Sequence, residues 1–265
     1  MTMISEPIRF TDGAGYERFM GVWSRLAGQQ FLDWIAPNHG QRWLDVGCGN
    51  GAFTQLIVNN SEPSSLVGID PSEAQLAFAR KHPLLQGVDF VNADAMALPF
   101  ADDAFDLAVM PLVIFFVPEP AQGVAEMVRV VAPGGTVAAY AWDMEGGGFP
   151  YQSVNETLSA VGRPAPMPPS PECSRIEALS DLWTIAGLED IQTTAIDVQR
   201  TFADFDDVWN TVLGGPSAGQ ALAAMAVEEV SRFRELLRDR LQPGGSGPVS
   251  LSGRAHAIRG TVPGR

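Results

Sequence analysis

Nine residues determine the predicted fold: Trp43-Leu44-Asp45-Val46-Gly47-Cys48-Gly49-Asn50-Gly51. The apolar residues at the start predict a short buried strand, and the alternating glycines predict a turn that side chains would crowd. Residues 52–58 (AFTQLIV) have helical spacing, so a helix is expected directly after the turn. A strand, a glycine-rich turn and a helix N-terminus together form a cradle for a nucleotide cofactor, because backbone N–H groups there can donate to the ligand.

Strand-like and helix-like segments alternate on both sides of this stretch. A helix is predicted over residues 16–36, before the glycine-rich turn. Strands are predicted at 42–47, 66–70, 88–93, 105–110 and 135–142. Helices are predicted at 50–58, 72–81 and 120–131, with a weaker one after Asp94. This alternation is typical of a mainly parallel sheet with helices on both faces.

The alternation stops after Trp142. Residues 143–171 contain three consecutive glycines and a proline cluster, and connections of this length are usually lids or binding elements. The pattern resumes with a helix at 176–186, a strand at 190–200, a helix at 218–241 and a closing strand at 249–258.

Composition limits the class of protein. The chain has 265 residues, 46% of them hydrophobic, and a mean hydropathy of +0.04, which is typical of a globular protein. The net charge of −14 disfavours nucleic acid as a partner. The cysteines, Cys48 and Cys173, indicate neither a disulfide framework nor a metal site. The start of the chain lacks the apolar core of a signal peptide, and the apolar run 107–117 is too short for a bilayer. We therefore expect a cytoplasmic protein with no membrane partner.

Acidic residues follow two of the predicted strands. Ligands of open parallel sheets bind at the carboxyl ends of the strands. Asp70 ends the second strand, about 20 residues past the glycines, where a carboxylate can accept from both ribose hydroxyls. Asp94 follows the third strand, beside the expected base, and Met110 and Pro111 follow the fourth. Helix capping is a serious alternative role for Asp70 alone.

Five segments carry a family resemblance: LDVGCGNGAF, VGIDPSE, NADAMALPF, FDLAVM and VAPGGTVAAY. Their order and spacing resemble those of class I S-adenosylmethionine (SAM)-dependent methyltransferases. The chain is most similar to the small-molecule branch that contains the ubiquinone/menaquinone-biosynthesis methyltransferases. The leading YERFMGVWSR resembles the N-terminal helix of many bacterial members.

The resemblance implies an α/β fold, a doubly wound, mainly parallel, seven-stranded Rossmann-like sheet whose last strand is antiparallel, with helical cap elements. It implies a single methyltransferase domain over 1–265. The expected parts are an N-terminal helical cap (1–41), a SAM-binding core (42–142), cap and substrate insertions (143–175 and 202–245) and completion of the sheet (176–201 and 246–265).

The resemblance also implies roles in cofactor binding. The glycine loop would lie beneath the methionine part of SAM, and Asp45 would help hold its amino group. Asp70 would bind the ribose, Asp94 the adenine amino group, and Ala95 would stack nearby. The cofactor-binding residues expected are Tyr16, Asp45, Gly47, Cys48, Gly49, Asn50, Asp70, Pro71, Asp94, Ala95 and Met110. The sequence does not assign a catalytic residue, and no metal ligand is expected.

The expected function is methyl transfer from SAM, with S-adenosylhomocysteine as product, to a small, largely apolar molecule. Three segments are candidate lids, 16–25, 143–171 and 202–216, and their aromatic residues would contact the acceptor: Trp23, Trp142, Phe149 and Trp209. Aromatic residues at helical spacing are as often part of the core. Relatives often carry Asn or His at the position of Phe115, so we expect a more apolar site here.

Two alternatives remain open at this point. One is a non-catalytic SAM-binding module, because a fold does not fix a function. The other is a nicotinamide-dependent oxidoreductase, which is less favoured because the glycine spacing differs from a dinucleotide fingerprint. The chain is expected to be a monomer or a homodimer.

Overall fold

The structure, a computed structural model, describes residues 17–215 and 218–264. One seven-stranded sheet has the order β3-β2-β1-β4-β5-β7-β6. Its strands are β1 (Arg42–Val46), β2 (Ser65–Asp70), β3 (Asp89–Asn92), β4 (Phe105–Pro111), β5 (Val131–Trp142), β6 (Glu189–Phe202) and β7 (Val249–Thr261). The first five pair in parallel, whereas β7 is antiparallel to both of its neighbours, β5 and β6. The predicted mainly parallel sheet with an antiparallel last strand is confirmed.

Helices cover both faces of the sheet. Successive side chains of a strand point to opposite faces, and consecutive residues of the central strands are buried, so both faces need a covering layer. On one face, Tyr140 of β5 packs against Phe31 of α2 (Val22–Ile35) and Phe53 of α3 (Ala52–Asn60). On the other face, α7 (Ile176–Ile185) lies against β6 and β7, and Trp183 donates its indole N–H to the backbone oxygen of Val137 in β5 at 3.0 Å. The remaining core helices are α4 (Glu73–Ala79) and α5 (Pro120–Val130).

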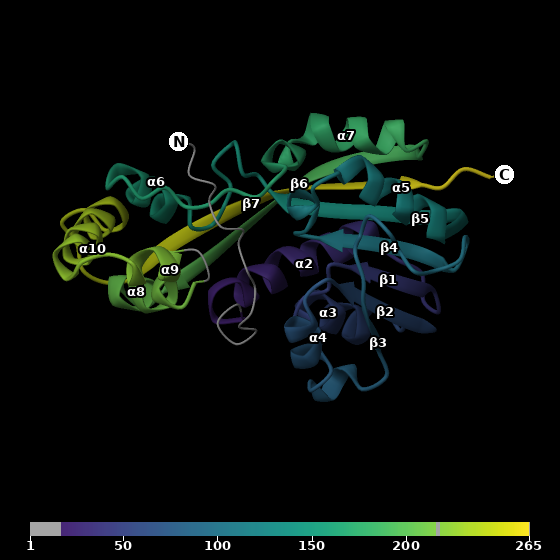
Figure 1. Cartoon of the computed structure of the whole chain (residues 1–265), viewed down its shortest axis with the longest axis horizontal. Helices are drawn as coiled ribbons and strands as arrows, with labels where there is room; N and C mark the ends of the chain where they lie inside the picture. Colours follow the sequence, from purple (N-terminus) through teal and green to yellow (C-terminus); the bar gives the residue numbers. More distant parts are fainter. Residues whose placement is uncertain (1–16, 216–217, 265) are drawn as a thin grey trace.

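The hairpin of β6 and β7 is longer than the rest of the sheet. β5 pairs with residues 255–261 of β7, so residues 249–254 pair with β6 alone. The chain between the two strands forms α8 (Phe205–Leu213), α9 (Ala218–Ala223) and α10 (Val227–Leu241). Together with α6 (Gln152–Ala160), which packs against α10, these helices make up a helical lobe at the far end of the hairpin (Figure 1).

Two helix predictions are wrong. The helix predicted over 218–241 is divided into α9 and α10, because Glu229 accepts from the backbone N–H of Ala226 and starts a new helix there. The weaker helix predicted after Asp94 is a tight turn, in which Asp94 accepts from the N–H of Met96 and bridges to Ala97.

Other elements were not predicted or differ in detail. α6 and α8 lie in segments expected as lids, and α8 begins where the Asp204 side chain accepts from the N–H of Asp207. The helix predicted over 16–36 is a π-helical turn (Glu17–Gly21) followed by α2. Tyr16 lies outside the described residues. No described helix has the length and apolarity needed to cross a membrane. The single domain expected over 1–265 stays a prediction.

Trp183 is the clearest test of the packing on the α7 face. Its side chain is fully buried, and a Cβ added at Gly260 would come within 2.9 Å of its ring. We expect Trp183→Ala to lower the free energy of unfolding by about 3–5 kcal/mol in urea denaturation. Ile185→Ala on the same helix, where the side chain is 77% exposed, should change it by less than about 0.5 kcal/mol. Similar losses for both variants would contradict the assigned packing.

Candidate cofactor site

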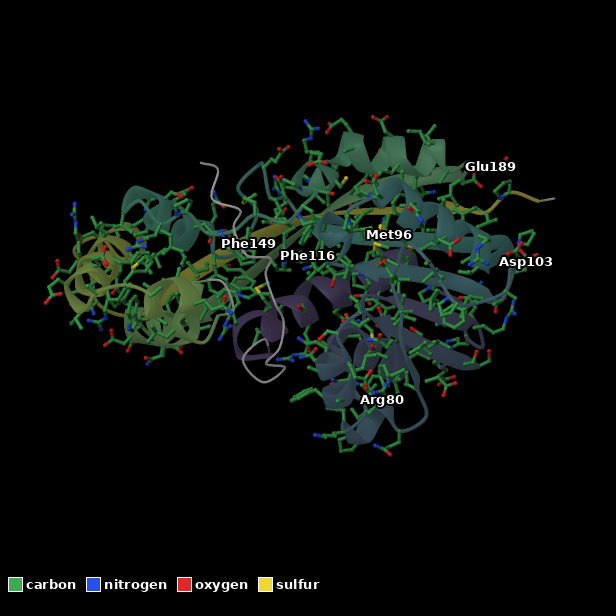
Figure 2. The ribbon with its side chains drawn as sticks, in the orientation of Figure 1. Arg80, Met96, Asp103, Phe116, Phe149 and Glu189 are labelled. Atoms are coloured by element: carbon green, nitrogen blue, oxygen red, sulfur yellow. The ribbon has the colours of Figure 1, made fainter. Side chains whose placement is uncertain are left out.

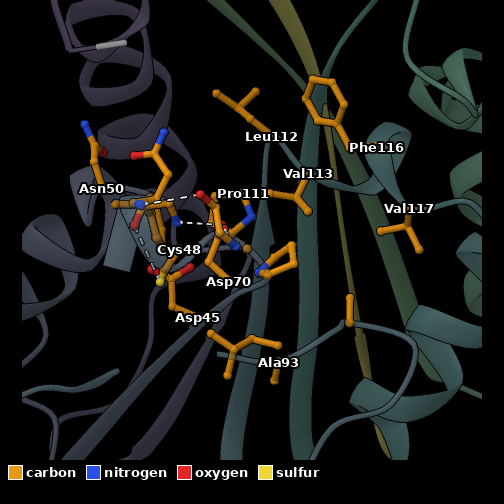
Figure 3. Close-up of a pocket in the computed structure, with 18 of the residues that line it drawn as sticks. Asp45, Cys48, Asn50, Asp70, Ala93, Pro111, Leu112, Val113, Phe116 and Val117 are labelled. Atoms are coloured by element: carbon orange, nitrogen blue, oxygen red, sulfur yellow. Dashed lines mark hydrogen bonds between the residues drawn. The ribbon is translucent and has the colours of Figure 1, made fainter. Parts of the chain in front are cut away.

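A cavity of about 500 Å³ opens at the carboxyl ends of the central strands. It is lined by the loop after β1, by the ends of β2 and β3, and by the segment after β4. Figure 3 shows polar side chains on one side, among them Asp45, Cys48, Asn50 and Asp70, and apolar side chains on the other. This is the position at which open parallel sheets bind ligands.

The loop after β1 requires glycine at two positions. Gly47 and Gly51 have φ values of +75° and +85°, and a Cβ added to them would lie 2.5 Å from Val113 and 2.6 Å from Leu85. Gly49 differs, because its φ is +53° but an added Cβ would meet no atom within 4 Å. Since Gly49 lines the cavity, this open space is available to a ligand that approaches the backbone closely.

Asp70 connects the end of β2 to the glycine loop. Its Oδ2 accepts from the N–H of Gly49 at 3.0 Å, and its Oδ1 accepts from the N–H of Ser72 at 2.8 Å. Burial raises the pKa of Asp70, and these two hydrogen bonds oppose the rise. The carboxylate thus holds the loop in place, which is a role that the sequence did not predict.

Asp45, at the end of β1, has one oxygen without a partner. The residue is fully buried, and its Oδ2 accepts from the Thr54 hydroxyl at 2.7 Å. Its Oδ1 is buried and has no hydrogen-bond partner among the described residues. Burial raises the pKa of Asp45 to about 7; the Thr54 hydrogen bond opposes this, and repulsion from Asp70 adds to it. An unpaired acceptor that lines a cavity is suited to a cationic group of a ligand.

The end of β3 forms the rim of the cavity. Asp94 is exposed, and its Oδ1 accepts from the N–H of Met96 at 2.9 Å. Ala95 and Pro71 line the cavity beside it. Besides Asp70, the cavity therefore has a second carboxylate that can accept a hydrogen bond. Asp94 follows the third strand, which is where the sequence analysis expected it.

The segment after β4 supplies the apolar wall. Leu112 adopts the left-handed conformation (φ +60°) and donates its backbone N–H to the oxygen of Tyr140 at 2.7 Å. Strained residues of this kind are concentrated at functional sites. The wall consists of Pro111, Leu112, Val113, Phe116, Val117 and Pro118. Phe115, the residue singled out in the sequence, is buried and lies behind this wall.

The structure brings together most of the residues predicted to bind the cofactor. Met110 is an exception, because its side chain is fully buried and Pro111 lines the cavity in its place. Tyr16 lies outside the described residues. The predicted residues that line the cavity are Asp45, Gly47, Cys48, Gly49, Asn50, Asp70, Pro71, Asp94 and Ala95.

The aromatic residues expected at the acceptor do not line this cavity. Trp23 is buried and donates its indole N–H to the Tyr151 hydroxyl at 3.0 Å. Phe149 packs against Tyr151 on the side of the helical lobe (Figure 2). Trp142 is buried, and Trp209 packs against Phe233, with ring centroids 6.0 Å apart. Trp23, Trp142 and Trp209 are part of the hydrophobic core, and the partly buried Phe149 packs against it. A place in the core was the alternative weighed for Trp23. Their contact with an acceptor stays a prediction.

Several lining residues were not predicted from the sequence, and two of them lie on the helices beside the glycine loop. Ser24 of α2 and Phe53 of α3 both line the cavity. The sequence did contain a signal for Ser24. This residue lies four positions after Met20, so its polar side chain falls on the buried, otherwise apolar face of the helix. No group of three or more His, Cys, Asp or Glu side chains suited to a metal ion occurs in residues 17–215 and 218–264.

The buried Asp45 carboxyl makes stability depend on pH. Its folded pKa of about 7 exceeds the ordinary value of 3.8, so the contribution of this one carboxyl to the stability of the unliganded protein falls as pH rises from about 4 to about 7. Asp45→Asn removes this ionisation. We therefore expect the variant to gain up to about 4 kcal/mol in unfolding free energy relative to wild type over this interval. Urea denaturation across the pH range measures the difference.

The exposed carboxylate of Asp89 provides the control for this measurement. Asp89→Asn should show no comparable change between the same pH values, since that side chain is already solvated. A constant difference between wild type and Asp45→Asn from about pH 4 to about pH 8 would rule out the assigned ionisation.

Comparison with known proteins agrees with this site. Residues 44–139 match the model of the methyltransferase domain family. The ubiquinone/menaquinone biosynthesis C-methyltransferase UbiE of Roseobacter denitrificans is 35% identical over 115 residues, which are 42% of this chain and 46% of that protein. A phthiotriol/phenolphthiotriol dimycocerosates methyltransferase of Mycobacterium ulcerans is 35% identical over 96 residues, 36% of this chain and 35% of that protein. The chain thus spans less than half the length of these relatives.

Solved structures share the whole fold at low sequence identity. A putative methyltransferase from Bacillus halodurans has a TM-score of 0.60 and 18% identity, and the match covers 89% of this chain and 99% of that one. A phosphoethanolamine N-methyltransferase from Haemonchus contortus, in complex with S-adenosylhomocysteine, has a TM-score of 0.59 and 17% identity, over 94% and 56% of the two chains. Residues 44–139 therefore match the methyltransferase domain family, and the chain shares the fold of these solved methyltransferase structures.

Proposed function

We propose that the protein transfers a methyl group from SAM to a small, largely apolar acceptor. One observation carries this proposal: a single cavity joins a polar wall suited to SAM to an apolar wall free of charged groups. The polar wall comes from β1, β2 and β3, and the apolar wall comes from the segment after β4. Ligand cavities of about this size commonly combine a few polar groups with an apolar lining.

The residues of the polar wall fit the parts of SAM. The unpaired Oδ1 of Asp45 is an acceptor for the ammonium group, and the space above Gly49 admits a ligand against the backbone. Asp70 retains acceptor capacity for ribose hydroxyls, since each carboxylate oxygen can accept more than one hydrogen bond. Asp94 at the rim is suited to accept from the adenine amino group.

SAM, when bound, supplies a reactive methyl group on its sulfonium. The protein's own contribution is to hold donor and acceptor in line and to keep water away from them. The apolar segment from Pro111 to Pro118 is suited to exclude water. The carboxylates that line the cavity, at Asp45, Asp70 and Asp94, are all on the polar wall. His256 is bound through Nδ1 to the backbone oxygen of Ser174 at 2.8 Å and lies outside the cavity lining.

The character of the acceptor follows from the apolar wall. Phe116, Val117 and Val113 offer dispersion contacts and no hydrogen bonds from their side chains. The matching relatives are named for ubiquinone and menaquinone biosynthesis and for phthiotriol dimycocerosates. These names support an apolar acceptor.

Binding of S-adenosylhomocysteine tests the placement of the cofactor. We expect Asp70→Ala to weaken binding by about 1–3 kcal/mol, because ligand hydroxyls lose an acceptor and the glycine loop loses its anchor. Isothermal titration calorimetry measures the effect. Asp89→Ala, at the opposite end of the parallel strands, should bind with wild-type affinity. Unchanged affinity of Asp70→Ala would place the ribose elsewhere.

Methyl transfer itself is tested with SAM that carries a tritiated methyl group and a panel of alkylated phenols and hydroquinones. We expect label in the organic extract, and we expect Phe116→Ala to lower kcat/KM for the acceptor by about 10-fold through lost apolar contact. Phe78→Ala, on the exposed face of α4, is the matched control. Binding of S-adenosylhomocysteine without transfer to any acceptor would instead support a non-catalytic SAM-binding module.

A further inference from the structure

Ser24 of α2 carries a hydroxyl that no described residue of the protein pairs with. The residue is only 6% exposed, and it lines the cavity. Its Oγ is buried and has no hydrogen-bond partner in the described part of the chain. Buried polar groups are rarely left unpaired, and an exception next to a cavity points to a ligand atom.

The surroundings of Ser24 indicate which ligand atom this is. Gly28, one helical turn further along α2, packs against Phe53 and Leu56, so α2 crosses the beginning of α3. Ser24, Asn50 and Phe53 line the same cavity. The N-terminus of α3 carries the positive end of the helix dipole and favours an anion. A hydroxyl donor beside it is therefore suited to a carboxylate.

A second unpaired group lies in the same cavity lining. The Oδ1 of Asp45 has no partner within the described residues and is suited to an ammonium group. Asp45 is joined to α3 through its hydrogen bond with Thr54. One acceptor for a cation and one donor for an anion, both in the lining of this cavity, match the two charges of an α-amino acid group.

We propose that Ser24 donates a hydrogen bond to the carboxylate at the amino-acid end of the cofactor and so makes α2 part of the cofactor site. This inference rests on the proposed function, since it concerns the same cavity. It assigns a specificity role to a residue of the N-terminal helix: Ser24 distinguishes SAM and S-adenosylhomocysteine from adenosyl compounds that lack the amino-acid end.

Two ligands and one matched variant test the assignment. Titration calorimetry compares S-adenosylhomocysteine with 5′-methylthioadenosine, which keeps the adenosyl group and lacks the amino-acid end. We expect Ser24→Ala to weaken S-adenosylhomocysteine by about 10-fold and to leave 5′-methylthioadenosine within about twofold. Ser61→Ala removes another buried, unpaired hydroxyl, at the far end of α3 and outside the cavity lining, and should change neither affinity.

Thermal denaturation without ligand separates this role from a packing role. Because the Ser24 hydroxyl has no described partner, Ser24→Ala should melt at or above the wild-type temperature. Equal weakening of both ligands by Ser24→Ala, or no weakening of S-adenosylhomocysteine, would overturn the assignment while leaving the cofactor site intact. Failure of the wild type to bind either ligand would overturn the proposed function together with this inference.

Discussion

The cavity depends on the backbone conformation of the loop between β1 and α3. Left-handed residues at Gly47, Gly49 and Gly51 turn the chain sharply enough for α3 to begin beside the end of β1. Val113 and Leu85 fill the space that side chains at two of these positions would need. Asp70 then fixes the loop to the neighbouring strand through the N–H of Gly49. Loop, strand ends and helix N-terminus are thus held in one arrangement before a ligand arrives, which lowers the entropic cost of binding.

Among the described residues, this arrangement leaves the buried Oδ1 of Asp45 and the buried hydroxyl of Ser24 without a hydrogen-bond partner. Both groups lower the stability of the unliganded protein, because they make fewer hydrogen bonds in the folded chain than they would make with water. A ligand with a cationic and an anionic group removes both penalties. The strain at Leu112, on the opposite wall, is a third local cost within the same site.

The core of the fold and most of its polar wall were predictable from the sequence, whereas the helical lobe was not. The glycine spacing and the acids at strand ends are local patterns, so Asp45, Asp70 and Asp94 could be placed from the order of strands alone. The break before Val227 depends on one side chain, Glu229, that accepts from a backbone N–H. Trp209 could not be assigned, because its aromatic ring suits a lid and a core equally, and only the position of Phe233 decides between them.

The long hairpin of β6 and β7 has a consequence for how such a chain can change over evolutionary time. Phe202 and Val249, where the chain enters and leaves the helices α8 to α10, are paired neighbours on adjacent strands. Segments of very different length can therefore replace residues 203–248 with both ends still joined to the same hairpin. The sheet order and the glycine loop need not adjust to such a replacement. The helices α8 to α10 can thus vary while the cofactor site stays the same.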